Sequence, residues 1–154
     1  MLARGILACA IAIWASSVFS CPVPDGYGPA LDEVVSLTNT YRAEKRRKPL
    51  TPSIALNEAA QNHACFMAST GVLSHTGQGG SDLGNRVAAT GFQYGIAAEN
   101  IAEGQPFADS VVAAWAGSKG HRKNMLHKKI TEIGVGVAVR NGRPFWVMVL
   151  AASR

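Results

Sequence analysis

Cysteine is scarce in this chain. Only three of its 154 residues are Cys, and no two of them are separated by just two residues. A thiolate zinc knot and a thioredoxin-like redox centre both need such a Cys-x-x-Cys pair. The sequence therefore excludes both kinds of site.

Long hydrophobic runs and aromatic residues are also few. The longest apolar stretch, residues 5–15, is shorter than the roughly 20 residues with which a helix crosses a bilayer. Phe, Trp and Tyr make up 7% of the chain, and no aromatic residue interrupts the basic tract from residue 121 to 129. A retained membrane anchor and nucleic-acid binding are therefore both disfavoured.

The first twenty residues nevertheless predict export. Arg4 is the only charge before Asp25, and the apolar stretch ends in the small polar pair Ser16-Ser17. This order is typical of a secretory signal peptide. We therefore predict a signal peptide over 1–20, a Pro/Gly-rich lead-in over 21–30 and one domain over 31–154. The protein is then secreted or periplasmic and has no transmembrane segment after cleavage.

Two cysteines remain after that cleavage, and two alternatives stay open for them. Either Cys21 and Cys65 form one disulfide in an oxidising compartment, or Cys21 is lipidated or free and Cys65 is a buried free thiol. The sequence Val18-Phe19-Ser20 before Cys21 resembles a bacterial lipobox, in which Phe19 fits poorly. Soluble export is therefore predicted ahead of a lipid anchor through Cys21.

The chain has a formal net charge of +5 at pH 7. Its basic residues gather in two places, after the first predicted helix (Arg42, Lys45, Arg46, Arg47, Lys48) and in the tract His121-Arg122-Lys123 with His127-Lys128-Lys129. Such clusters favour anionic partners such as lipid headgroups, acidic glycans or cell-wall polymers, and they also occur as solvated helix faces.

Apolar residues at helical spacing predict four helices, over 31–48, 51–70, 83–91 and 107–118. In the second helix we expect Thr51 as the N-cap and Pro52 as the first helical residue. His63 lies on its apolar stripe, where it is either a core histidine or a further metal ligand. Between the second and third helices lies a loop rich in Gly, Ser and Thr that contains His75, and loops of this length are often functional.

The clearest strand signal is C-terminal. Apolar residues alternate over 132–139, Asn141-Gly142 is a strong hairpin turn, and residues 145–150 are apolar on both faces. A sheet covered on both faces needs helices above and below, which predicts a three-layer α-β-α sandwich around an antiparallel sheet. Gly134 and Gly136 would let a helix or a ligand approach that sheet closely.

Three polar side chains are the candidates for a site. His75, Glu99 and His121 supply two imidazoles and a carboxylate, which are ordinary ligands for a zinc-like ion and can also share a proton. The alternative is a buried polar network that fixes loop and helix ends without any chemistry.

Seven short motifs, in order along residues 31–152, resemble those of the CAP superfamily, which comprises cysteine-rich secretory proteins, antigen 5 and pathogenesis-related proteins. The likeness is greatest to its short bacterial secreted members. The motifs are Asn39-x-Tyr41-Arg42, Leu56-Asn57-x-Ala59-Ala60-Gln61-x-His63-Ala64, Ser74-His75, Glu99-Asn100-Ile101-Ala102, Trp115-x-x-Ser118, Gly120-His121-Arg122-x-Asn124-x-Leu126 and Glu132-Ile133-Gly134-Val135-Gly136.

The resemblance implies an α-β-α sandwich of the CAP (SCP) type with a cleft that holds two histidines and acidic partners, and in some members a divalent ion. The matching residues here are His75, His121 and Glu99. A second acid of the eukaryotic pattern is replaced by Ser118. Losing an outer partner of this kind typically lowers metal affinity by about 10–100-fold, so we expect a weak zinc-like site.

Several functions remain open at this level. The first is a cleft, around His75, Glu99, Ser118 and His121, that binds a small ligand (lipid-like or other), a divalent metal, or both. The alternatives are a metal-dependent hydrolase acting on peptide or cell-wall bonds, and a basic module that binds an anionic cell-surface polymer. Acyl transfer by Ser118, His121 and Glu99 is disfavoured because Ser118 ends a helical stripe instead of following a strand.

Overall fold

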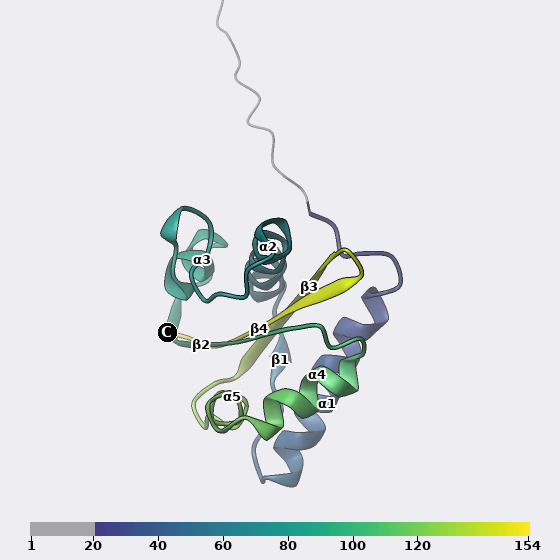
Figure 1. The fold of residues 1–154 in the computed structure, drawn as a ribbon. Coiled ribbons are helices and arrows are strands. Elements are labelled where there is room, and N and C mark those ends of the chain that lie inside the picture. Colours follow the sequence, from purple (N-terminus) through teal and green to yellow (C-terminus); the bar gives the residue numbers. More distant parts are fainter. Residues whose placement is uncertain (1–20) are drawn as a thin grey trace, which may run out of the picture.

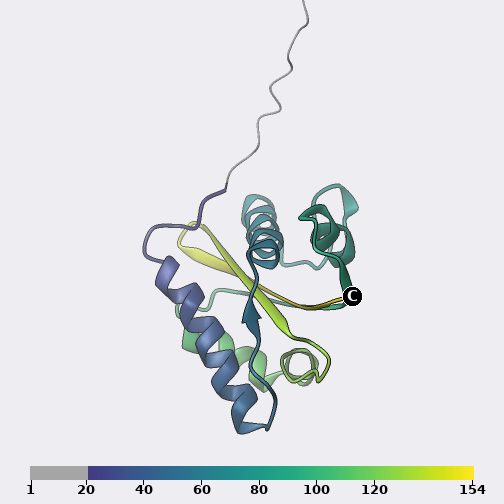
Figure 2. The same ribbon diagram turned by 180° about the vertical axis from the view of Figure 1, so that it is seen from behind.

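The computed structural model describes residues 21–154, and the predicted signal peptide lies outside them. Five α-helices of this part of the chain cover the two faces of one sheet (Figures 1 and 2). On one face lie α1 (Gly28–Glu44), α4 (Ala108–Gly117) and α5 (Lys119–Met125); on the other lie α2 (Ile54–Thr70) and α3 (Leu83–Ala89). A short 3-10 turn, Gln78–Gly80, precedes α3. The predicted three-layer α-β-α sandwich is confirmed.

The sheet has four strands in the order β1-β3-β4-β2. They are β1 (Thr51–Pro52), β2 (Tyr94–Glu103), β3 (Glu132–Arg140) and β4 (Arg143–Ser153). The β2–β4 and β3–β4 pairs are antiparallel, as expected, and the short β1 pairs with β3 in parallel. Strand β2, which carries Glu99, therefore forms one edge of the sheet.

Strand β4 contributes to the hydrophobic core on both faces of the sheet. Its residues point alternately to the two helical layers, because successive side chains of a strand face opposite ways. Trp146, Met148 and Leu150 join the core with α1 and α4, whereas Val147 and Val149 join the core with α2. All five are fully buried.

The hairpin between β3 and β4 confirms the turn prediction. Asn141 has φ 50° and Gly142 has φ 75°, so both central residues are in the left-handed region that a type I′ turn requires. Gly134 and Gly136 are also explained, since a Cβ at either position would overlap the backbone of α2. The close approach predicted for these glycines is thus made by a helix.

Two boundary predictions are wrong. The first helix ends at Glu44, so the basic residues 45–48 follow it and do not form its last turn. Thr51 and Pro52 do not begin the second helix but form β1, where the Thr51 amide donates to the Thr131 carbonyl. The helix begins at Ile54, with Ser53 in an extended conformation as its N-cap. Proline fits this position as well, because a strand of two residues at a sheet edge leaves its missing N–H without consequence.

A disulfide joins Cys21 to Cys65. It ties the lead-in segment to the middle of α2, across 44 residues of sequence. Of the two alternatives left open by the sequence, the structure has the disulfide. A sulfur engaged in this bond cannot carry a lipid at the same time.

Candidate functional site

Glu99 is the centre of the candidate site. It projects from β2 toward the layer of α2 and α3, and its side chain is only 3% exposed. Oε1 accepts a hydrogen bond from Nδ1 of His75 at 2.8 Å, and Oε2 accepts one from Nη2 of Arg86 at 2.7 Å. Both oxygens of the buried carboxylate are therefore engaged by cationic or potentially cationic partners, as a buried charge requires.

His75 connects this carboxylate to the solvent. Its side chain is 61% exposed although its Nδ1 is bonded to Glu99. A carboxylate that accepts from Nδ1 leaves Nε2 as the nitrogen with the free lone pair when the ring is neutral. The pair consequently resembles an oriented general base or metal ligand, whose other nitrogen is accessible from water.

Arg86, which the sequence analysis did not single out, fixes both partners. It lies on α3, a helix that begins with a capping box between Asp82 and Asn85. Its Nη1 donates to the backbone carbonyls of His75 and Ser81, at 3.1 and 3.0 Å. A buried glutamate needs a counter-ion, and the nearest arginine before it in the chain was the only sequence signal that could have identified Arg86.

His63 is a core histidine. It is 1% exposed, and its Nε2 donates to the Ser74 carbonyl at 2.8 Å, next to His75 in the chain. Burial is the largest cause of its lowered pKa; the charge of Glu99, 3.9 Å away, opposes that shift only in part. A neutral His63 therefore holds the loop that carries His75. Together with Arg86 it also lines a small pocket of about 170 Å³ between α2 and the segment 78–90.

His121 comes from the opposite helical layer. It lies on α5, and its pKa is lowered by burial and, to a lesser extent, by the charge of His75. Its ring is therefore neutral near pH 7. His75 bonds to Glu99 and the backbone of His121 to Asn100, so both histidines lie beside neighbouring residues of the same strand. They approach from the two sides of the edge strand β2.

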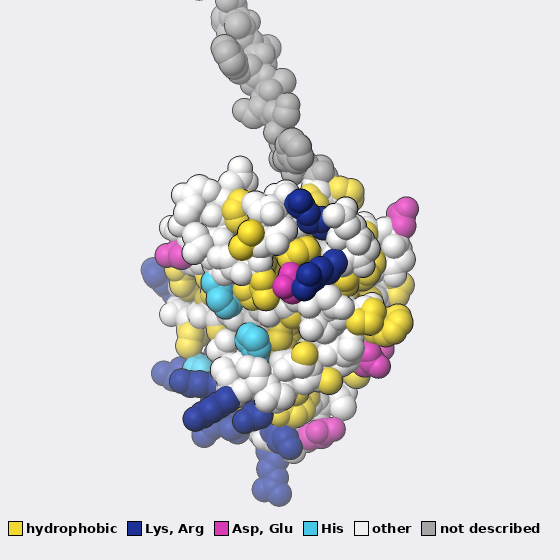
Figure 3. Space-filling model, viewed as in Figure 1, with side chains coloured by type: hydrophobic (Ala, Val, Ile, Leu, Met, Phe, Trp, Pro, Cys, Tyr) yellow, Lys and Arg dark blue, Asp and Glu magenta, His cyan; other side chains and the backbone are white. Residues whose placement is uncertain are grey.

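Two asparagines attach α5 to that strand. Asn100 follows Glu99 on β2 and points to the other face, where its Nδ2 donates to the His121 carbonyl at 3.1 Å. Nδ2 of Asn124 donates to Asn100 Oδ1 and to the Glu99 carbonyl, at 2.9 and 3.2 Å. The alternation of Glu99 and Asn100 thus fixes one histidine in each layer. Histidine side chains are exposed on the face shown in Figure 3.

Ser118 is the remaining predicted cleft residue. It lies between α4 and α5, and as the N-cap residue of α5 its side chain makes no capping hydrogen bond. Its position between two helices does not match the strand-to-helix turn of a nucleophile elbow. Acyl transfer by this serine has no support in the geometry.

The three-ligand metal centre is not assembled either. Among the described residues, no three His, Cys, Asp or Glu side chains are grouped so that they could hold an ion. Glu99 already accepts from His75 and from Arg86, whose positive charge disfavours a second cation at the same carboxylate. The residues therefore do not fit a centre with Glu99 as a direct ligand, and what remains is a pair of imidazoles.

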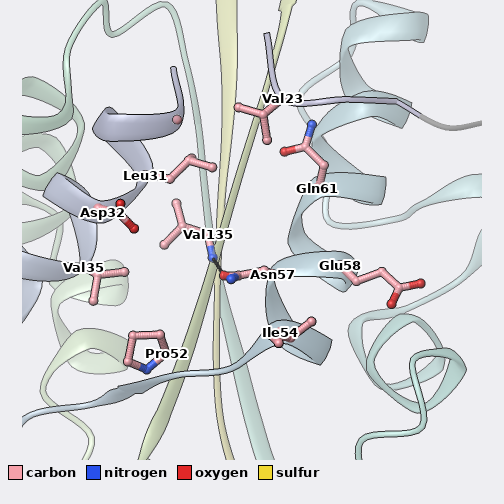
Figure 4. Close-up of a pocket in the computed structure, with 11 residues that line it drawn as sticks. Val23, Leu31, Asp32, Val35, Pro52, Ile54, Asn57, Glu58, Gln61 and Val135 are labelled. Carbon is pink, nitrogen blue, oxygen red and sulfur yellow. Dashed lines mark hydrogen bonds between the residues drawn. The ribbon is translucent and has the colours of Figure 1, made fainter. Parts of the chain in front are cut away.

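A separate groove of about 370 Å³ lies at the other edge of the sheet, between α1 and α2 (Figure 4). Val135 of β3 forms its floor, and Leu31 and Val35 line the α1 side. The amide of Val135 donates to Asn57 Oδ1 at 2.9 Å, so a side chain of α2 takes the place of a neighbouring strand. None of the predicted site residues lines this groove.

The fold and these motifs define a known class of protein. The model of the CAP family, described as the cysteine-rich secretory protein family, matches residues 35–150. The chain belongs to this family.

Several bacterial proteins are similar to it. It is 36% identical over 104 residues to the uncharacterized protein YkwD of Bacillus subtilis, a match covering 68% of this chain and 40% of that protein. Among solved structures it is similar to an extracellular SCP-domain protein of Bacillus anthracis (TM-score 0.78, 24% identity, 87% of this chain, 45% of that one). It is also similar to an outer surface protein of Borrelia burgdorferi (TM-score 0.77, 17% identity, 83% and 96%). The chain thus spans less than half the length of YkwD and of the B. anthracis protein.

These comparisons bear on location as well. Both structural neighbours are described as extracellular or outer-surface proteins. None of the helices in residues 21–154 combines the length and the hydrophobicity that crossing a bilayer requires.

Proposed function

We propose that this protein is an exported CAP-domain protein that binds a small ligand over the outer edge of β2, between His75 and His121. The observation that carries the proposal is the contact between His75 Nδ1 and Glu99 Oε1. The His75 side chain is 61% exposed, whereas the carboxylate to which it is bonded is only 3% exposed. A buried charge that orients an exposed ring is costly to maintain, and it supports binding at that ring more than it supports packing.

The chemistry of the two rings suggests the ligand class. A neutral imidazole carries one N–H donor and one lone pair. The lowered pKa of His121 keeps that ring neutral near pH 7, and Nε2 of His75 is its free nitrogen. Two such groups suit a ligand with hydroxyl or amide groups, such as a sugar–peptide fragment or the headgroup of a lipid.

NMR titration tests this proposal. Soluble peptidoglycan fragments and, separately, lysophospholipid micelles are added to the oxidised protein, residues 21–154, and the histidine ring signals are followed. We expect those of His75 and His121 to move and those of His127 to stay. His121→Ala should weaken binding about tenfold or more, as loss of one hydrogen bond to a buried partner does, whereas the matched variant His127→Ala should not. Rings that stay unchanged with both probes would contradict the proposal.

Metal binding is a second candidate, restricted to the two imidazoles as donors. Calorimetric titration with zinc, on the wild type and on His75→Ala and His121→Ala, tests it. Equal heats in all three proteins would remove it. Glu99→Gln keeps both rings but loses the carboxylate that orients His75, so any zinc affinity should fall by about 10–100-fold in that variant.

Hydrolysis of peptide or cell-wall bonds is the remaining alternative. It is distinguished from binding by analysing the peptidoglycan fragments after incubation. Intact fragments that still shift the two rings support the binding function. Cleavage that disappears in His75→Ala would favour a hydrolase.

A further inference from the structure

One end of the molecule carries most of its positive charge. We call the segments 42–48 and 119–129 together the basic end. They contain ten of the fifteen Lys and Arg residues of the chain, with Glu44 as their only acid. Figure 3 shows Lys and Arg side chains gathered at the lower end of the molecule, where Figure 1 places α5 beside the end of α1. Residues about 80 apart in sequence thus form a single surface.

Backbone hydrogen bonds hold the two segments together. Arg42 is 1% exposed, and its guanidinium donates to the carbonyls of Lys48, Met125 and His127 at 2.8, 2.6 and 3.3 Å. Arg47 donates to the carbonyl of Leu126 at 3.0 Å. Two arginines therefore clamp one basic segment onto the other, although like charges brought together repel each other.

No ion pair neutralises this surface. The ion pairs of the described residues involve Glu99 or Glu103, and none includes a residue of the basic end. Seven of its side chains are exposed: Lys45, Arg46, Lys48, Lys119, Lys123, Lys128 and Lys129. A solvated helix face is usually laced with both signs of charge. A surface with seven exposed cations and one acid, assembled from two segments, instead fits a partner that supplies the missing negative charge.

We propose that the basic end binds a linear polyanion of the cell envelope, a polymer with phosphate or carboxylate groups repeated along its chain. Several exposed ammonium groups spread over one surface match repeated charges better than a single anion. A membrane fits less well, because the large exposed hydrophobic residues, Ile54, Val72, Leu73 and Phe107, all lie outside the basic end. The segment 119–129 also carries His121, but none of the seven exposed cations belongs to the site around Glu99, so the two proposals are tested with different residues.

A binding experiment with linear polyphosphate tests this inference. Affinity is measured for the oxidised protein as a function of NaCl concentration, with the variant Lys128→Gln/Lys129→Gln. The matched control, Arg143→Gln/Arg154→Gln, removes two charges elsewhere. We expect the first variant to bind polyphosphate about tenfold more weakly. The slope of log affinity against log NaCl concentration should also become shallower by the contribution of nearly two contacts, about 0.7–0.9 for each. The control should change affinity less than about twofold.

Arg46→Gly adds a variant that does not threaten folding. Arg46 has φ 55° where the end of α1 favours glycine, so this change removes a charge while relieving the backbone. We expect weaker polyphosphate binding with unchanged or higher thermal stability. Equal losses in the test and control variants would show that only net charge matters and would overturn the proposal. Binding to phosphatidylglycerol vesicles but not to polyphosphate would overturn it too, in favour of a membrane partner.

Discussion

At the scale of single residues, the site depends on the balance of charge around Glu99. This carboxylate is buried between Arg86 and His75, with the buried His63 ring 3.9 Å away. Removing one partner of a buried ion pair leaves the other charge unpaired, which costs more than the pair itself contributes. Arg86 is therefore as necessary for the site as the histidines that the family resemblance identified.

This view predicts a strong effect at Arg86. Arg86→Met should lower the free energy of unfolding by about 3–5 kcal/mol, because Glu99 then lacks its main counter-ion. The double variant Arg86→Met/Glu99→Gln should recover part of that loss, since no buried charge remains. Urea denaturation measures both. A double variant less stable than Arg86→Met alone would show that the ion pair is not what the arginine contributes.

His63 should make stability depend on pH. Burial lowers its pKa in the folded protein. The unfolded chain, with a pKa near 6.5, therefore takes up a proton first as the pH falls. The stabilisation is complete above about pH 6.5 and is lost as the pH falls toward the lower, folded pKa. In His63→Gln, urea denaturation at about pH 7.5 and about pH 5.0 should show a smaller loss of stability than in the wild type. An equal loss would exclude His63 as its source.

At the scale of elements, the sequence predicted best what depends on local pattern. The β3–β4 hairpin and the helix ending at Gly71 follow from turn and cap residues, and both are present. The start of α2 was misplaced because Thr51-Pro52 satisfies a helix N-terminus and an edge strand equally well. Only the pairing with β3, about 80 residues later, decides between them. Arg86 was missed for the same reason, because its partner is fixed by tertiary contacts.

The close packing of α2 on β3 predicts that a side chain at Gly136 destabilises the fold, whereas one at a glycine with open space around it does not. Gly136→Ala should lower stability by roughly 3 kcal/mol or more, because its Cβ would overlap the backbone at Ala60 and Gln61. Gly120→Ala is the matched control. It lies in α5 with open space around the added Cβ, and should raise stability by about 0.5 kcal/mol. Thermal unfolding of both variants checks this, and a Gly136→Ala protein as stable as the wild type would contradict the close approach.

At the scale of the whole molecule, the family's motifs predicted the three-layer fold. They also predicted that His75, Glu99 and His121 lie in one region of it. They did not predict what each of these three side chains does in the site. Glu99 was expected as a ligand, yet it lies behind His75 with both oxygens occupied. A family motif describes which residues recur at matching positions of related sequences. The hydrogen-bond partner of each side chain also depends on residues outside the motifs, such as Arg86.

The disulfide is the remaining constraint on the whole chain. Cys21 is followed by a lead-in without regular structure, so the bond to Cys65 fixes that segment against α2. Closing a loop across 44 residues restricts the unfolded chain and should stabilise the fold by about 3–4 kcal/mol. Cys21→Ser/Cys65→Ser should lose stability by that amount in urea denaturation, and reduction of the wild type should give the same value. The ring of His75 is held by Glu99 of β2 and the backbone of His121 by Asn100, whereas His63 lies two residues from Cys65 on α2. The ring signals of His75 and His121 should therefore keep their positions in the reduced protein. Signals that move on reduction would show that the lead-in segment influences the site as well as the stability of the domain.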